Sequence, residues 1–290
     1  MCRFVAYLGQ APIFLSQILE APENSLIHQS SSARQASCTN ADGFGVAWYN
    51  HPIDETPGLF KSIQPAWNDF NLTHLAHKIS SHCVLGHVRA STVGDVSNNN
   101  CHPFAYEKLS FEHNGTIRHF EKLRRKLLAS LNDASFNLIH GNTDSEHFFA
   151  LVVAQLPPTN GNWTVEQLAE AFVKSISLIE QWQRELGDDV ANNGSHINSV
   201  LTDGYSVLAS RYTSVPLREP LSLYYIHGES IAEALNLRLN SKKAPFVLVA
   251  SEPLGGHEQQ WQKIPDNHLL LVRPDLSLTL RKIEISTHAQ

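Results

Sequence analysis

The chain has 290 residues and a mass of 32.3 kDa, with 42% hydrophobic and 17% charged residues, so it can bury the core of one large or two small globular domains. Its formal charge of −6 and its isoelectric point near 6.2 exclude a protein that binds nucleic acid through a broad basic surface. The short basic segment 118–126 fits the solvated face of a helix.

Apolar and aromatic runs bounded by Gly, Asn and Asp predict buried strands in the first third of the chain. These strands are residues 3–8, 44–49 and 83–89. Apolar residues at helical spacing then predict an amphipathic helix at 117–131 and a second one at 164–186.

The second helix has sequence signals at both ends. Thr164 and Gln167 stand in capping-box register at its start, and Gly187 follows its last turn. After residue 194 the pattern changes to short strands, at 197–212 with an Asp-Gly turn, 221–227, 246–252 and 269–285. Strands, then helices, then strands predict two sheets with helical layers outside them, and no repeat or linker marks a domain boundary.

The cysteines are spaced too widely for a disulfide framework or a thiolate zinc site, and none forms a C-x-x-C pair. They are Cys2, Cys38, Cys83 and Cys101. The apolar stretch at the start of the chain is too short for a signal peptide or a membrane-spanning helix. We therefore expect a soluble, cytoplasmic protein.

Sixteen histidines include the pair His74 and His77, which could share one face of a helix. No carboxylate or third ligand follows at the spacing of a known metal site. We expect no bound metal, and a metalloenzyme built on these histidines stays as an alternative.

The segment GHVRAST, residues 86–92, carries a strand into a polar turn. Arg89 at such a strand end can bind a carboxylate through two charge-assisted hydrogen bonds, and the Thr92 hydroxyl can add a third. The alternative is that Arg89 pairs with a structural carboxylate of the chain.

The segment FEHNGTI, residues 111–117, contains Asn114-Gly115, a dipeptide typical of a hairpin turn. The residues after it have helical periodicity, so the predicted turn joins a strand to a helix. The Asn114 amide and the N–H of Gly115, aimed at one point, would supply the two donors of an oxyanion hole.

The segment GNTDSEHFFALVV, residues 141–153, places Thr143 and Glu146 in capping-box register before an apolar run. This pattern predicts a helix start. It also places Asp144 in the first turn, where its carboxylate can receive an ammonium group.

Cys2 gains a role from these groups if Met1 is removed. It then carries a thiol and a free α-amino group whose unperturbed pKa is about 8. This amino group can act as the base that activates the thiol of the same residue. Cys38, Cys83 and Cys101 are predicted to be core or loop cysteines. Together the singled-out residues are those needed to hold a γ-glutamyl group and attack its side-chain carbonyl.

Five motifs in order, MCRFVAYLG, DGFGVAWY, GHVRAST, FEHNGTI and GNTDSEHF, closely resemble the glutaminase domain of class II glutamine amidotransferases, a branch of the N-terminal nucleophile hydrolases. VASEPL, from Val249, resembles the closing strand of the stand-alone members, which include γ-glutamyl hydrolases of ergothioneine biosynthesis and glutathione degradation. The resemblance implies an α+β fold, a four-layer αββα sandwich with Cys2 at the start of a central strand. It also implies a single domain over residues 2–290, with Met1 removed.

The resemblance implies a role for each candidate residue. Cys2 is the nucleophile and, through its amino group, the base, while Asn114 and the Gly115 N–H stabilise the oxyanion. Arg89 and Thr92 bind the substrate α-carboxylate. Asp144 binds its α-amino group, and Gly43 lines the glutamyl pocket through its backbone.

These roles predict a hydrolase that cleaves the γ-glutamyl amide bond of glutamine or a γ-glutamyl compound through a Cys2 thioester, releasing glutamate and an amine or ammonia. Two alternatives stay open: an ammonia-supplying subunit of a separate synthase, and a catalytically silent sensor that binds glutamine or a γ-glutamyl compound. We expect a small-molecule γ-glutamyl substrate, no cofactor, and neither nucleic acid nor membrane as a partner. A synthase partner and a homo-oligomer are left open.

Overall fold

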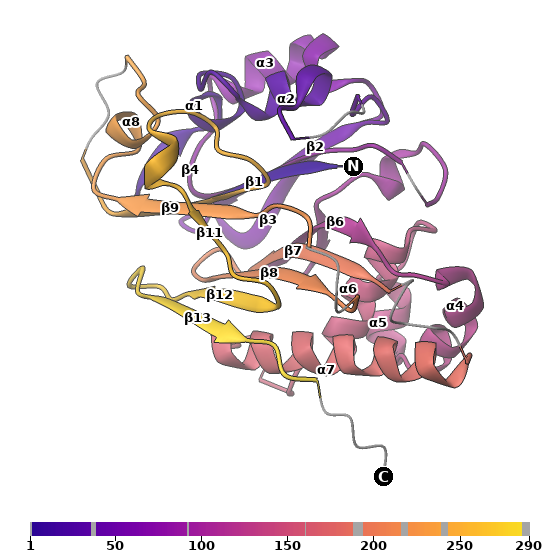
Figure 1. Cartoon of the computed structure of the whole chain (residues 1–290). Helices are drawn as coiled ribbons and strands as arrows, with labels where there is room; N and C mark the ends of the chain where they lie inside the picture. Colours follow the sequence, from indigo (N-terminus) through magenta and orange to yellow (C-terminus); the bar gives the residue numbers. More distant parts are fainter. Residues whose placement is uncertain are drawn as a thin grey trace.

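Two antiparallel sheets lie face to face, with helices on both outer sides, in the computed structural model (Figure 1). The structure describes residues 2–35, 39–91, 93–159, 161–187, 194–215, 220–238 and 243–285. Three residues that entered the predictions, Met1, Cys38 and Thr92, lie outside these ranges. In the described part of the chain, no helix is both long and apolar enough to cross a membrane.

The first sheet contains the N-terminal strand near its centre, in the strand order β11-β9-β10-β1-β4-β2-β3. Its strands are β1 (Arg3–Phe14), β2 (Phe44–Asn50), β3 (Asp54–Ser62), β4 (Ser80–Val88), β9 (Tyr224–Gly228), β10 (Phe246–Ala250) and β11 (Gln262–Lys263). The start of β1 is therefore flanked by β4 on one side and β10 on the other.

The second sheet has the strand order β13-β12-β8-β7-β6-β5. Its strands are β5 (Phe104–Tyr106), β6 (Leu109–Thr116), β7 (His196–Thr202), β8 (Val207–Thr213), β12 (His268–Val272) and β13 (Leu278–Lys282). The strand with the Asn114-Gly115 pair, β6, lies between β5 and β7.

Helices cover the outer face of each sheet (Figure 1). The first sheet is covered by α1 (Ser16–Leu19), α2 (Leu26–Ser32), α3 (Phe70–Ala76) and α8 (Ile231–Ala234). The second sheet is covered by α4 (Phe120–Ala129), α5 (Asp133–Asn137), α6 (Asp144–Ala154) and α7 (Val165–Glu185).

Side-chain alternation along β1 accounts for this layering. Val5 and Tyr7 face the helices of the first sheet, and Phe4, Ala6 and Leu8 face the second sheet. Because β1 is buried on both faces, it is a continuous apolar run. The predicted four-layer αββα sandwich is confirmed.

The helix signals at 164–186 are also confirmed. Thr164 and Gln167 exchange both bonds of a capping box, and Gly187 has a φ of +71° just past the last turn. The other predicted helix starts later than expected, at Phe120. The N–H of Ile117 donates to Asp144 and the N–H of Arg118 donates to Ser195, so both residues belong to the link between β6 and α4.

Candidate active site

Three neighbouring strands of the first sheet bring their ends together. The β1–β4 register sets Arg3 opposite Val88, and the β2–β4 register sets Phe44 opposite the same Val88. Because the strands are antiparallel, the residues just outside these pairs are neighbours. They are Cys2, Gly43, Arg89 and Ala90.

The Cys2 thiol is held against the chain that leaves β4. Its Sγ accepts a hydrogen bond from the N–H of Ala90 at 3.3 Å and lies 3.4 Å from the Ala90 carbonyl oxygen. Burial raises the pKa of the Cys2 thiol above its usual value, while the Ala90 N–H and the Arg89 guanidinium partly oppose this rise. A thiol with such a pKa needs a base to become a thiolate at neutral pH.

Arg89 is buried, and its guanidinium is surrounded by oxygens of the turn that follows it. It donates to the carbonyl of Asp95 at 3.0 Å, to the carbonyl of Val93 at 3.1 Å and to the Ser91 hydroxyl at 3.1 Å. Among the described residues no carboxylate forms an ion pair with it. A buried cation without a counter-ion is costly, so this position suits an anionic group of a substrate.

Gly43 lets two chain segments approach closely beside Cys2. Its carbonyl accepts a hydrogen bond from the Arg89 N–H at 2.8 Å, and its φ is +107°. A Cβ at this position would lie 2.7 Å from both Cys101 Sγ and the Ser62 carbonyl oxygen. Glycine is therefore required by the backbone here, while the role of Gly43 in substrate binding stays a prediction.

Asn114 and Gly115 lie within strand β6, so the predicted turn at this dipeptide is wrong. They pair with Asn198 and Ile197 of β7, whose ladder keeps the chain extended. The Asn114 side chain is buried, and its Nδ2 has no hydrogen-bond partner. The fold thus leaves this amide free to donate to another group, as an oxyanion-hole donor must be.

Buried histidines join the two sheets beside these residues. His87 of β4 donates through Nε2 to the His113 carbonyl of β6 at 3.2 Å. The His87 ring also stacks on His102 with 4.1 Å between ring centroids. Burial lowers the pKa of His87 to about 3 and holds the pKa of His102 well below its usual value, so both rings are neutral at pH 7.

Asp144, the first residue of α6, is bound to the end of β6. Its Oδ2 accepts from the Ile117 N–H at 2.8 Å, and its Oδ1 accepts from the Ser145 N–H at 2.9 Å. The Ser145 hydroxyl in turn lies 2.8 Å from His113 Nδ1. These bonds place Asp144 next to the strand that carries Asn114.

The predicted capping box at the start of α6 is only half formed. The Thr143 hydroxyl accepts from the Glu146 N–H at 3.2 Å, as expected. The Glu146 carboxylate, however, accepts from the N–H groups of His140 and Gly141 instead of returning to Thr143. Glu146 therefore fastens the loop that precedes the helix.

The candidate residues form two groups, one at each sheet. Cys2, Gly43 and Arg89 gather at one end of the first sheet, and Asn114, Gly115 and Asp144 gather at the end of β6. The hydrogen bond from His87 to the His113 carbonyl connects these ends. The predicted carboxylate-binding hydroxyl of Thr92 lies outside the described residues.

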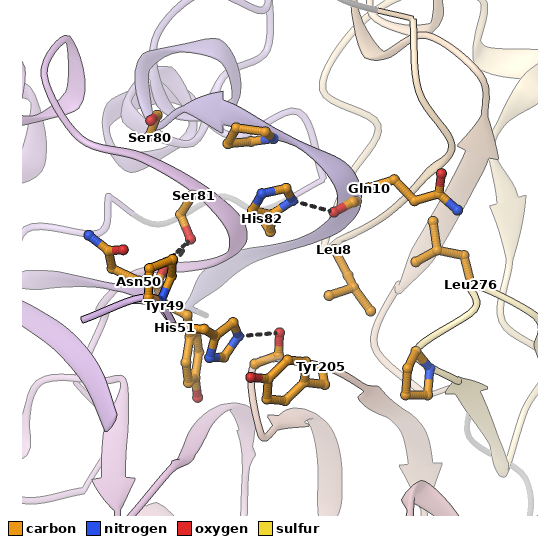
Figure 2. Close-up of a pocket in the computed structure, with 15 residues that line it drawn as sticks. Leu8, Gln10, Tyr49, Asn50, His51, Ser80, Ser81, His82, Tyr205 and Leu276 are labelled. Carbon is orange, nitrogen blue, oxygen red and sulfur yellow. Dashed lines mark hydrogen bonds between the residues drawn. The ribbon is translucent and has the colours of Figure 1, made fainter. Parts of the chain in front are cut away.

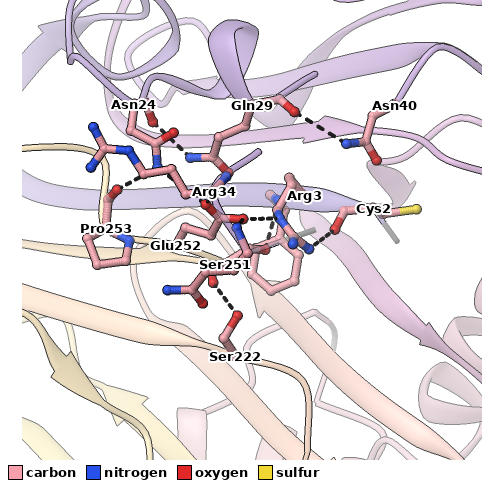
Figure 3. Close-up of polar contacts among 12 residues, drawn as sticks. Cys2, Arg3, Asn24, Gln29, Arg34, Asn40, Ser222, Ser251, Glu252 and Pro253 are labelled. Atoms are coloured by element: carbon pink, nitrogen blue, oxygen red, sulfur yellow. Dashed lines mark hydrogen bonds and ion pairs between the residues drawn. The ribbon is translucent and has the colours of Figure 1, made fainter. Parts of the chain in front are cut away.

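A buried ion pair behind Cys2 was not anticipated from the sequence. Arg3 Nε lies 2.7 Å from Glu252 Oε1, and Arg3 Nη1 donates to the Cys2 carbonyl at 2.9 Å. Glu252 also accepts from the backbone N–H groups of Arg34 and Gln35. Figure 3 shows the Cys2 thiol pointing away from this cluster, which therefore holds the backbone of Cys2 and makes no contact with its thiol.

The His74–His77 pair does not gather metal ligands. Nε2 of His77 lies 2.9 Å from Glu20 Oε2, and the His77 side chain is 59% exposed. Within the ranges that the structure describes, no group of three His, Cys, Asp or Glu side chains is arranged to hold a metal ion. The metalloenzyme alternative therefore has no ligand set among these residues.

Comparison with known proteins identifies the family of this chain. The family model described as glutamine amidotransferases class-II matches residues 19–288, and the chain belongs to this family. The match begins after Cys2, so it leaves the role of that residue untested.

Two relatives and a solved structure match nearly the whole chain. The probable glutamine amidotransferase DUG3 of Saccharomyces cerevisiae is 38% identical over 294 residues, which cover 94% of this chain and 82% of that protein. The gamma-glutamyl-hercynylcysteine sulfoxide hydrolase of Mycolicibacterium smegmatis is 29% identical over 275 residues, which cover 94% and 96%. A glutamine aminotransferase class-II domain protein from Silicibacter pomeroyi has the same fold, with a TM-score of 0.66, 24% identity and coverage of 97% and 99%.

Proposed function

We propose that this chain hydrolyses γ-glutamyl amide bonds with Cys2 as an N-terminal nucleophile. One observation carries the proposal: the Cys2 thiol lies against the strand end that bears Arg89, a buried cation without a carboxylate partner among the described residues. A nucleophile beside an unpaired cation suits a substrate that joins an anionic group to a reactive carbonyl.

The first half of the reaction forms a thioester. The Cys2 α-amino group, free once Met1 is removed, takes the thiol proton, and Sγ bonds to the γ-carbonyl carbon. Asn114 Nδ2 and the Gly115 N–H stabilise the resulting oxyanion. The C–N bond then breaks, and the α-ammonium group of Cys2 gives its proton to the leaving amine.

The second half releases glutamate. Water attacks the thioester carbonyl while the Cys2 α-amino group takes one of its protons. The C–S bond breaks, and the proton returns to the sulfur. The nucleophile and its base are thereby restored without a further reactant.

The same proposal assigns the glutamyl end of the substrate to the surrounding residues. Arg89 and Thr92 bind the α-carboxylate, and Asp144 binds the α-ammonium group through its remaining lone pairs. Gly43 lines the pocket through its backbone. All these groups belong to one catalytic domain, which we place at residues 2–290.

A relative supports a leaving group larger than ammonia. The mycobacterial relative is named for the hydrolysis of a γ-glutamyl bond in a bulky sulfur compound, and its match spans almost the full length of both chains. We therefore favour a stand-alone hydrolase over the ammonia-supplying subunit of a separate synthase.

The test is glutamate release by protein whose mature N-terminus has been verified, with glutamine, glutathione and several γ-glutamyl amides as substrates. Cys2→Ala should abolish release, whereas Cys83→Ala, which alters a buried thiol between the two sheets, should retain it. Release from bulky amides would support the hydrolase.

Other outcomes separate the alternatives. Release from glutamine alone would favour the ammonia-supplying subunit, and a search for its synthase would follow. No release from any substrate by protein with a free Cys2 would favour the silent sensor and overturn the proposal. Activity that survives in Cys2→Ala would overturn the assigned nucleophile.

A further inference from the structure

A cavity, shown in Figure 2, is lined in part by the ends of β1, β2 and β4 that lie opposite the end with Cys2. It has a volume of about 540 Å³ and is lined by Leu8 of β1, by the end of β2 and by the start of β4. The β7–β8 turn and the loop before β13 complete its wall. Since β1, β2 and β4 each have their other end at the candidate active site, the cavity is separate from that site.

The lining of the cavity is short of charged side chains: no Asp, Glu, Lys or Arg is among the described residues that form it. Its apolar surface comes mainly from two leucines, three prolines and two tyrosines: Leu8, Leu276, Pro12, Pro52, Pro274, Tyr49 and Tyr205. A charged ligand would lose its hydration here without gaining an ion pair, so the lining favours a neutral and largely apolar ligand.

One side of the cavity is a stack of two flat rings. The rings of His51 and Tyr205 have centroids 3.9 Å apart and planes 11° apart. Tyr205 remains 40% exposed, so part of its surface is still available for contact. A ligand with a flat aromatic ring would extend such a stack.

Hydrogen bonds fix what the two histidines of the wall can offer. His51 Nε2 lies 3.2 Å from the Gly204 carbonyl, and His82 Nδ1 lies 3.1 Å from the Gly9 carbonyl (Figure 2). A carbonyl only accepts, so each of these nitrogens carries a proton, and that N–H is already paired within the protein. Neither of these two N–H groups is therefore left for a ligand.

We propose that this cavity binds a neutral, flat aromatic compound of fused-ring size. The ring packs among the prolines, leucines and Tyr205, where no charged side chain of the described lining could pair with an ionic group. The volume lies within the range of about 300–1,000 Å³ that is usual for small-molecule sites. The proposal stands apart from the hydrolytic activity, because no residue of the candidate active site lines this cavity.

Indole and indole-3-carboxylate are suitable probes, since they share the same fused ring and only the second is an anion at neutral pH. Binding to the full chain is measured by ligand-observed saturation-transfer NMR titration. We expect indole to bind about tenfold more tightly than indole-3-carboxylate, because the carboxylate would lose its hydration without gaining an ion pair. Equal affinity for the two probes, or no indole binding, would overturn the proposal.

A pair of variants locates the binding. Tyr205→Ala removes the aromatic wall and should weaken indole binding about five- to tenfold. Phe136→Ala removes a similarly exposed ring, 52% exposed, from α5 and should leave binding unchanged. Far-UV circular dichroism checks that both variants are folded. Equal indole affinity of folded Tyr205→Ala and of the original chain would place the probe elsewhere and refute the assignment.

Discussion

The Asn114 side chain offers a hydrogen-bond donor that the fold does not use. Its Nδ2 is buried and unpartnered, so Asn114→Ala should lower kcat about 100-fold or more with little change in thermal stability. Kinetics of glutamate release and a melting curve measure the two effects. Asn198→Ala is the matched control, because that amide donates to the Leu221 and Ser222 carbonyls and its loss should reduce stability instead. An unchanged kcat in Asn114→Ala would argue against the oxyanion role.

Arg89 should recognise the substrate through the geometry of its guanidinium. Arg89→Lys keeps the charge but loses the planar pair of donors, so KM for a γ-glutamyl substrate should rise about tenfold or more. Steady-state kinetics on a substrate whose α-carboxylate is replaced by an amide provides the control. The original chain should have a high KM for that analogue, and Arg89→Lys should raise this KM little further. A similar loss on both substrates would show that Arg89 does not act on this carboxylate.

The types of residue and the order of the motifs indicated the candidate site. They did not indicate the ion pair that holds the backbone of Cys2 in place. Cys2, Arg89 and Asp144 stand beside recognisable strand ends or a helix cap, so local patterns pointed to them. The partner of Arg3 is Glu252, 249 positions away, and no periodicity in the sequence links them. Such a contact arises only when β10 pairs with β1.

Elements with their own local signals were predictable, and those that depend on distant partners were not. The helix α7 has a capping box, a long apolar stripe and Gly187 at its end. By contrast, β3 contains Pro57 and Gly58, has no fully buried residue and lies at a sheet edge, so its sequence lacks a strand pattern. Asn114-Gly115 resembled a turn because its pairing partner β7 comes about eighty residues later.

The Arg3–Glu252 ion pair joins the start of β1 to the residues after β10, and Glu252 also binds the backbone at residues 34–35. Glu252→Gln leaves the buried Arg3 charge uncompensated, so the free energy of unfolding should fall by about 3–5 kcal/mol. Urea denaturation measures this loss. Glu258→Gln, at a carboxylate that is 76% exposed and 3.6 Å from Arg34, should change stability by less than about 1 kcal/mol. Equal effects of the two substitutions would contradict the structural role given to Glu252.

The four-layer architecture as a whole followed from the family resemblance more than from periodicity. Apolar runs such as residues 3–8 predicted strands, but a strand buried on both faces has no alternation to say which residues face helices and which face the other sheet. The order of motifs supplied that information, because it matched a family whose layers were known.

A buried carboxyl group between the two sheets, that of Glu112, should make the free energy of unfolding depend on pH. Glu112 is fully buried, and neither of its carboxyl oxygens has a hydrogen-bond partner. Burial raises its pKa well above the usual value, so the folded protein keeps it protonated where the unfolded chain would ionise it. Its contribution to stability is therefore complete below a pH of about 4.5 and is lost as pH rises toward the folded pKa.

Glu112→Gln removes this proton dependence while keeping a similar shape. Relative to the original chain, the variant should gain stability as pH rises above about 4.5, by at most about 1.4 kcal/mol per pH unit, until the folded pKa is reached. Urea denaturation of both proteins at several pH values gives the difference, in which the other titrating groups cancel. Glu107→Gln is the control, since that carboxylate is exposed and its removal should leave the pH profile unchanged. The alternative outcome is a difference in stability between Glu112→Gln and the original chain that stays constant across pH. The Glu112 carboxyl would then have the same pKa in the folded protein and in the unfolded chain. Water would have to reach its position between the sheets.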